Sequence, residues 1–178
     1  DNLIVLYDNC VKSKKYDDIT AIDNYLYNYN DTKDYKDYVK QFIDIVSIEN
    51  KTECILTKYL ELYTILKKVY TIDSFLNVVE PILLETVSLD NLENKEKKLM
   101  EYVLDDLKKE TISEYLILVP LMDTEIFISI YLKYLCKRII NKKSNLVIEN
   151  NYLNELTKYN IEYLYKVSIV INDSVTSK

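Results

Sequence analysis

The chain has 178 residues, a formal net charge of −6, and neither glycine nor histidine. This composition argues against phosphate-binding loops, which need glycine, and against histidine-based catalysis or metal binding. The acidic charge argues against a broad nucleic-acid-binding face, which needs clustered Lys and Arg.

Length and composition indicate a globular protein, with room for one domain or parts of two. The first residue is Asp rather than Met, so we expect a piece of a longer protein. Cys10, Cys54 and Cys136 form no C-x-x-C pair, which fits reduced thiols in the cytoplasm or nucleus. The longest apolar run, 115–122, is far shorter than the roughly 20 residues that span a bilayer. No membrane association is therefore expected.

Apolar residues recur at helical spacing throughout the first half of the chain. The predicted helices cover residues 3–12, 22–29, 35–46, 54–69 and 75–83. No Gly or Pro separates the second helix from the third, so a single long helix is the alternative. Asp73 or Ser74 is expected to cap the fifth helix. Pro81 lies inside that helix and predicts a kink or a break.

The polar, charged segment 89–98 predicts a boundary, which gives one domain over 1–95 and a second over 96–178. Residues 99–109 form a predicted helix. The apolar segment 112–121 fits a buried helix or a strand, and its helical neighbours favour a helix interrupted near Pro120. Helices are also predicted over 146–159 and 162–172, with Asn160 as a left-handed stop between them. The predicted fold class is all-α, with antiparallel neighbours and short connections.

Residues 123–144 are predicted to form one amphipathic helix. Asp123 or Thr124 is expected to cap it, and basic residues crowd its far end. Cys136 is expected as a small buried filler. Arg138 is the only Arg, and a structural tie between helix ends is favoured for it over a binding contact with carboxylates. The predicted apolar face consists of Ile126, Phe127, Ile130, Tyr131, Tyr134, Leu135, Ile139 and Ile140.

The sequence shows no constellation typical of chemistry. The adjacent carboxylates at 17–18 and 105–106 point about 100° apart on a helix and do not share a site. No zinc spacing, Walker loop or nucleophile elbow occurs. We therefore expect no catalytic residue, no cofactor and no metal.

The order of residues in the second half resembles the cullin family. Residues 123–131 (DTEIFISIY) resemble "KDvFexxY", and 135–140 (LCKRII) with Ser144 resemble "LAKRLL…S". Glu149 to Leu156 have the spacing of "ExxMIxxL", and 170–173 (VIND) with Ser177 resemble "MfxD…S". Residues 99–109 resemble "lxxYiDdxLrK", and 59–75 match a cullin helix pair loosely. The departures are Cys136 for Ala and Asn160 for Gly. The family-motif residues are Phe127, Tyr131, Leu135, Lys137, Arg138, Ser144, Glu149, Leu156 and Asp173.

The resemblance implies a cullin-repeat-like helical bundle followed by the first helices of a four-helix bundle, elongated overall. It implies a non-catalytic scaffold segment of a multisubunit RING-type E3 ubiquitin ligase, which holds the adaptor and substrate apart from the RING–E2 end. The RING subunit and the substrate adaptor would bind parts of the parent chain outside this segment. The cullin-like subunit of the anaphase-promoting complex is a close variant.

The alternative is a stand-alone helical interaction module, such as a viral Bcl-2-like bundle, which takes a partner helix in a groove. That module predicts one compact core and a central helix that is apolar on nearly all sides.

Overall fold

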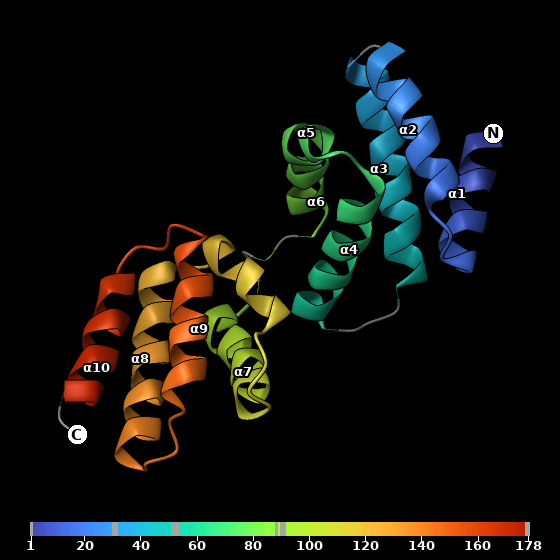
Figure 1. Ribbon diagram of the computed structural model, residues 1–178. Helices are drawn as coiled ribbons and strands as arrows, with labels where there is room; N and C mark the ends of the chain where they lie inside the picture. Colours follow the sequence, from blue (N-terminus) through green and yellow to red (C-terminus); the bar gives the residue numbers. More distant parts are fainter. Residues whose placement is uncertain (1, 30–31, 51–53, 88, 90–91, 177–178) are drawn as a thin grey trace. The chain divides into compact units, whose positions relative to one another are not determined.

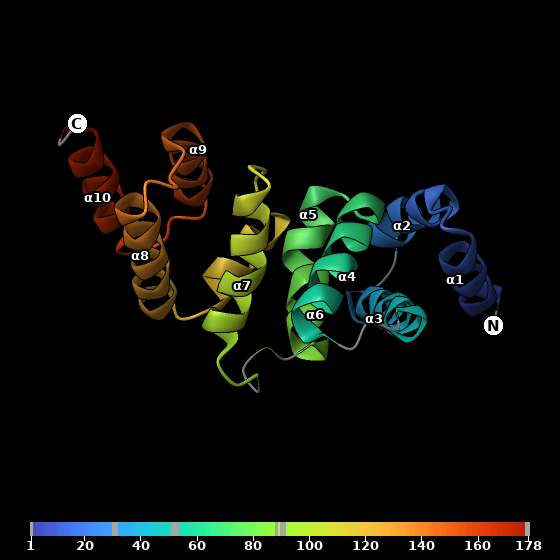
Figure 2. The same cartoon turned by 90° about the horizontal axis from the view of Figure 1, so that it is seen from below.

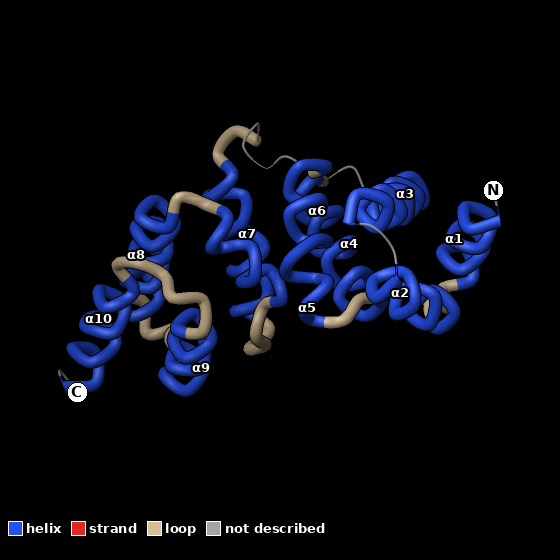
Figure 3. Tube along the Cα trace, turned by 90° about the horizontal axis from the view of Figure 1, so that it is seen from above, coloured by secondary structure: helices blue, strands red, loops and turns tan. Residues whose placement is uncertain are grey.

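The computed structural model describes residues 2–29, 32–50, 54–87, 89 and 92–176. All regular structure in these ranges is helical, and no strand occurs among them (Figures 1 and 3). The predicted all-α fold class is therefore confirmed. The ambiguous apolar segment forms a 3-10 helix, η2 (Glu114–Leu121), with Pro120 near its end.

The chain divides into two compact units, unit 1 over Asp1–Asn91 and unit 2 over Leu92–Lys178. The division falls inside the polar segment 89–98. Each unit has its own buried apolar residues.

Unit 1 begins with α1 (Asn2–Ser13), α2 (Asp17–Tyr29), α3 (Thr32–Glu49) and α4 (Ile55–Val69). The Phe42 ring in α3 is fully buried. The ring centroids of Tyr7, Tyr16 and Tyr70 lie 5.1, 6.5 and 6.0 Å from that of Phe42. Aromatic packing of this kind joins α1, α3 and the end of α4.

Helices α2 and α3 are separate elements that pack against each other. The Tyr35 hydroxyl in α3 donates to Oδ1 of Asp23 in α2 at 2.6 Å. In one continuous helix, residues this far apart would lie about 18 Å apart along the axis. The alternative of a single long helix is therefore wrong.

A continuous helical segment completes unit 1: α5 (Ile72–Ser74), the π-helical turn η1 (Phe75–Val79) and α6 (Glu80–Thr86). Thr71 caps it, accepting from the Ser74 N–H at 3.4 Å, so the prediction of Asp73 or Ser74 as the cap is wrong. The Ser74 side chain is buried and contacts the Tyr35 hydroxyl instead. The helix is not broken at Pro81. It contains a wider π turn, Phe75–Val79, just before this residue.

Unit 2 contains α7 (Lys95–Lys108), η2, α8 (Thr124–Ile140), α9 (Leu146–Thr157) and α10 (Leu164–Thr176). Helix α8 packs against α7 and α10, and α10 packs against α9 (Figure 1). The core of this unit includes the fully buried side chains of Leu99, Phe127, Leu135, Tyr152 and Leu156.

Three helices end in the same left-handed motif, although the chain has no glycine. Lys14, Glu110 and Lys142 have φ values of 58°, 56° and 56°. In each case the N–H of the next residue donates to the carbonyl five residues back, as in a Schellman motif. The turn at Lys142 ends α8 at Ile140, earlier than the predicted end at 144. Asn160 has φ 53°, which confirms the predicted left-handed stop.

Candidate functional site

Helix α8 begins at a cap that also links it to α7. The Asp123 carboxylate accepts from the Ile126 N–H at 3.2 Å, which confirms the predicted N-cap. The Asp123 N–H donates to Oε1 of the buried Glu96 in α7 at 3.0 Å. The N-terminal end of α8 is thus held by two hydrogen bonds, one within its own first turn and one to α7.

The core-facing side of α8 differs in part from the predicted face. Its buried residues are Phe127, Ile128, Tyr131 and Leu135. Ile126 and Ile140, predicted to face the core, are exposed, and the prediction missed Ile128. The reason is that apolar residues occupy most sides of this helix, so periodicity alone does not select one rotation. The remaining members of the predicted face, Ile130, Tyr134 and Ile139, are half-buried.

Cys136 is exposed, so its prediction as a buried filler is wrong. Leu135 takes the core-facing position, and the next residue on a helix is turned about 100° away. Cys10 is buried and Cys54 is half-buried.

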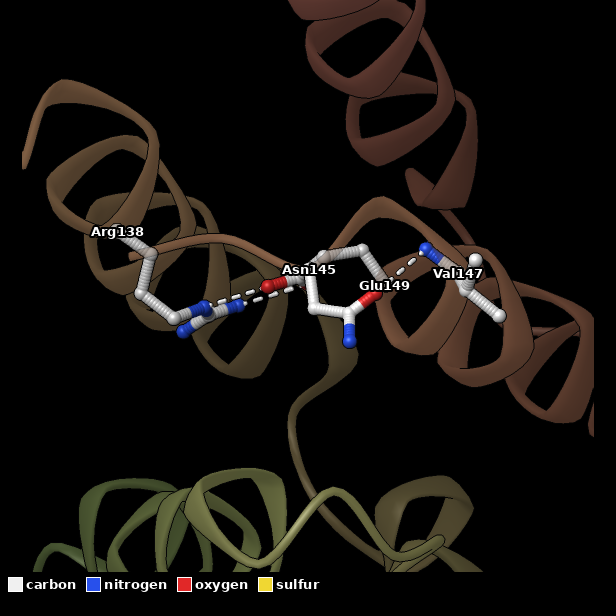
Figure 4. Close-up of polar contacts among 4 residues, drawn as sticks. All are labelled: Arg138, Asn145, Val147 and Glu149. Atoms are coloured by element: carbon white, nitrogen blue, oxygen red, sulfur yellow. Dashed lines mark hydrogen bonds and ion pairs between the residues drawn. The ribbon is translucent and has the colours of Figure 1, made fainter. Parts of the chain in front are cut away.

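An ion pair joins the end of α8 to α9. Arg138 Nε lies 2.6 Å from Glu149 Oε1, and Nη2 lies 3.0 Å from Oε2 (Figure 4). The Glu149 side chain is 1% exposed and that of Arg138 is 18% exposed. This two-bond geometry matches the planar guanidinium to the carboxylate. The predicted structural tie is therefore confirmed.

Tyr131 lies two turns before Arg138 on the same side of α8, and the guanidinium carbon is 5.8 Å from the centre of its ring. We call Tyr131, Arg138 and Glu149 the α8–α9 clamp. Burial, and then the Glu149 carboxylate, raise the pKa of Tyr131, while the Arg138 guanidinium opposes the rise. The Tyr131 hydroxyl and Arg138 Nη1 are buried without a hydrogen-bond partner among the described residues. Their desolvation offsets part of the clamp's stabilisation.

The start of α9 is held by side-chain caps. Asn145 Oδ1 accepts from the Val147 N–H at 3.1 Å (Figure 4), and its Nδ2 donates to Glu110 Oε1 at 3.3 Å. These bonds anchor the short α8–α9 connection to the end of α7 as well as to α9.

Tyr152 of α9 makes a further tie. Its hydroxyl donates to the Thr111 carbonyl at 2.5 Å and accepts from the Ser113 N–H at 3.0 Å. Burial raises the pKa of Tyr152 to about 12, although the Ser113 bond opposes the rise. This tie connects α9 to the segment between α7 and η2.

The structure brings together some of the family-motif residues and not others. Phe127, Leu135 and Leu156 are buried in unit 2, and Tyr131, Arg138 and Glu149 form the clamp. Lys137 is exposed and lies 5.5 Å from the centre of the Tyr134 ring. Ser144 is half-buried and Asp173 is exposed. Ser177 lies outside the described residues.

Glu96 is a further structural residue that sequence reasoning missed. It lies in the charged run 93–98, where neighbouring charges gave no sign that one carboxylate is buried.

Within the described part of the chain, no group of three or more His, Cys, Asp or Glu side chains is placed to hold a metal ion. None of the helices described there has the length and apolar content to cross a membrane. Comparisons with protein-family models, with curated proteins and with solved structures found no match for this chain.

Proposed function

We propose that this chain is a scaffold segment of a cullin-type, RING-dependent ubiquitin ligase. Unit 1 would correspond to a helical repeat of the stalk, and unit 2 to the start of the four-helix bundle. The segment would perform no bond chemistry. It would hold the substrate adaptor and the RING–E2 end of the parent protein apart, in the cytoplasm or nucleus.

The α8–α9 clamp is the observation that carries the proposal. Three separate sequence motifs contain Tyr131, Arg138 and Glu149, one residue each. Those motifs are defined by residue order alone and not by contacts in the structure. In the folded chain the Arg138 guanidinium contacts both the Tyr131 ring and the Glu149 carboxylate. Tyr131 and Arg138 meet through helix spacing alone, whereas the pairing of Arg138 with the buried Glu149 joins two different helices and is not set by local spacing. The clamp therefore supports the motif alignment, and through it the family.

The chemistry of the clamp also suits a scaffold. A scaffold raises the effective concentration of E2 and substrate by fixing their separation, which requires helices that do not slide past one another. Ties at Glu96, Arg138 and Tyr152 each join α7, α8 or α9 to another segment of unit 2. They favour a stiff packed body over an adaptable binding surface.

The Bcl-2-like alternative requires one core around a central helix. Here the buried side chains belong to two units, divided at residues 91 and 92. Helix α8, which packs against both α7 and α10, exposes Ile126 and Ile140. Both observations favour the scaffold.

The test is made on the parent protein, purified from its own cells with its companions and analysed by mass spectrometry. A small RING subunit and a ubiquitin-like adduct on the parent chain would support a cullin scaffold. A RING subunit without the adduct would favour the anaphase-promoting variant. A helical-peptide partner with neither would contradict both.

Small-angle scattering of the 178-residue chain gives a second test. A compact domain of this length has a radius of gyration of about 16 Å. The scaffold proposal expects a clearly larger value for the monomer, and a value near the compact one would count against it.

A further inference from the structure

The continuous segment α5–η1–α6 presents an apolar row to solvent. Ile72, Leu76 and Leu84 are 70%, 55% and 37% exposed, although each is a large aliphatic side chain. The opposite side of the same segment is buried in unit 1 through Phe75, Val78, Val79 and Leu83. Figure 2 shows α5 and α6 following one another beside α4. The segment thus has two apolar sides, and unit 1 covers only one of them.

The π turn reduces the drift of these exposed positions around the helix. Residues four apart drift around an α-helix, because a turn holds only roughly 3.6 residues. In η1 the Glu80 N–H donates to the Phe75 carbonyl, five residues back, so the turn is wider and takes up that drift. Pro81 follows directly, and its missing N–H and bulky ring disfavour a regular α turn at this point. π turns of this kind occur often at functional sites.

The row is bordered by acidic side chains. Asp73 and Glu85 are exposed and directly follow Ile72 and Leu84 in the sequence. Glu80 is half-buried and lies four residues from both Leu76 and Leu84. No Lys or Arg occurs anywhere between Thr71 and Asn94. A partner with positive charges is attracted to these carboxylates, and the pairing of opposite charges also fixes how the partner is aligned along the row. The same carboxylates repel lipid and nucleic-acid phosphates.

We propose that the row Ile72, Leu76 and Leu84, with its border of Asp73, Glu80 and Glu85, is a docking surface for a basic amphipathic helix of another protein. The row extends about 18 Å along the helical segment, which matches roughly three turns of a partner helix. Aliphatic side chains of the partner cover the row, and its flanking Lys or Arg side chains face the carboxylates. This surface does not depend on the scaffold role, so each can fail without the other.

The probe is a synthetic helix of about 18 residues that carries Leu on one face and Lys on the other. A matched peptide carries Glu in place of Lys. Binding to the full chain is measured by fluorescence anisotropy. We expect the Leu/Lys peptide to bind at least about tenfold more tightly than the Leu/Glu peptide, with affinity falling as salt is added.

Two variants locate the binding. Ile72→Ser with Leu76→Ser removes two of the three row side chains, and Asp73→Lys with Glu85→Lys reverses the charge of two of the three border residues. Each double variant should bind the Leu/Lys peptide about tenfold more weakly. Both pairs are at exposed positions, so the thermal midpoint by circular dichroism should stay within about 2 °C of the parent. The matched control is Ile169→Ser with Val175→Ser in α10, where the parent side chains are 53% and 50% exposed. It should leave the affinity unchanged.

Three results would overturn the proposal. The first is equal binding of the Leu/Lys and Leu/Glu peptides. The second is unchanged binding in the row variant. The third is an equal loss in the α10 control, which would mean that the peptide binds any exposed apolar residue on an acidic protein.

Discussion

Replacing Arg138 with Met tests whether the α8–α9 clamp stabilises unit 2. The substitution keeps most of the side-chain volume but leaves the Glu149 carboxylate, 1% exposed, without its guanidinium. Removing one partner of a buried ion pair costs about 3–5 kcal/mol. Arg138 is itself 18% exposed and its Nη1 has no described partner, so the low end applies. We expect Arg138→Met to lower the free energy of unfolding of unit 2 by about 3 kcal/mol.

The assay is urea unfolding followed by circular dichroism. Lys137→Met is the matched control, because Lys137 is the exposed neighbour on the same helix turn and should cost less than about 0.5 kcal/mol. Arg138→Met combined with Glu149→Met removes both charges and should recover most of the loss, since no buried charge is left unpaired. A loss below about 1 kcal/mol for Arg138→Met would show that solvent already screens the carboxylate. A double variant no more stable than the single one would show that the loss comes from packing.

Three further substitutions test separate features of the structure. Lys142→Gly should stabilise unit 2 by about 1 kcal/mol, because φ 56° strains a residue with a side chain; Lys143→Gly, outside the left-handed position, is the control, and equal effects would refute the explanation. Tyr152→Phe should cost about 1–2 kcal/mol by leaving the Ser113 N–H and the Thr111 carbonyl unpaired, whereas Tyr165→Phe on the surface should cost nothing measurable. Asp23→Asn tests the buried carboxyl of α2, whose pKa burial raises to about 6 against the opposing Tyr35 hydrogen bond. A raised carboxyl pKa means that the folded state holds its proton longer, so this group's contribution to stability is present below about pH 4 and is lost as the pH rises through 6. Because solvent partly screens this carboxyl, the loss is about 1–2 kcal/mol, and Asn should abolish it; parallel pH profiles of unfolding for the parent chain and the Asp23→Asn variant would disprove the assignment.

Local features of this fold can be predicted from the sequence because they depend on residues close together in the chain. The Asp123 cap and the Asn160 stop follow from side-chain chemistry within one helix turn. The prediction for the α5 cap is wrong because Thr71, Asp73 and Ser74 all have capping side chains. The competition is decided by the burial of Ser74 against Tyr35, a residue of another helix.

Features that depend on contact between distant segments cannot be predicted from local sequence. Apolar residues surround much of α8, so its periodicity fits several rotations, and the predictions for Cys136, Ile126 and Ile140 are wrong. The burial of Glu96 depends on the Asp123 N–H, which lies beyond the next helix. Arg138 is the exception, because a single Arg in a Lys-rich chain carries information by itself.

These differences lead to a last prediction about what fixes the rotation of α8. If apolar packing accepts several rotations, the polar ties at its two ends must select one. Removing the clamp by Arg138→Met with Glu149→Met should then keep most of the stability but allow α8 to populate more than one rotation. Ile128, which is buried in the observed rotation, reports this through its methyl resonance in an isoleucine-labelled sample. We expect one resonance in the parent chain and additional or broadened resonances in the double variant. A single sharp resonance in both proteins would mean that apolar packing alone orients the helix, and that the clamp contributes energy without specificity.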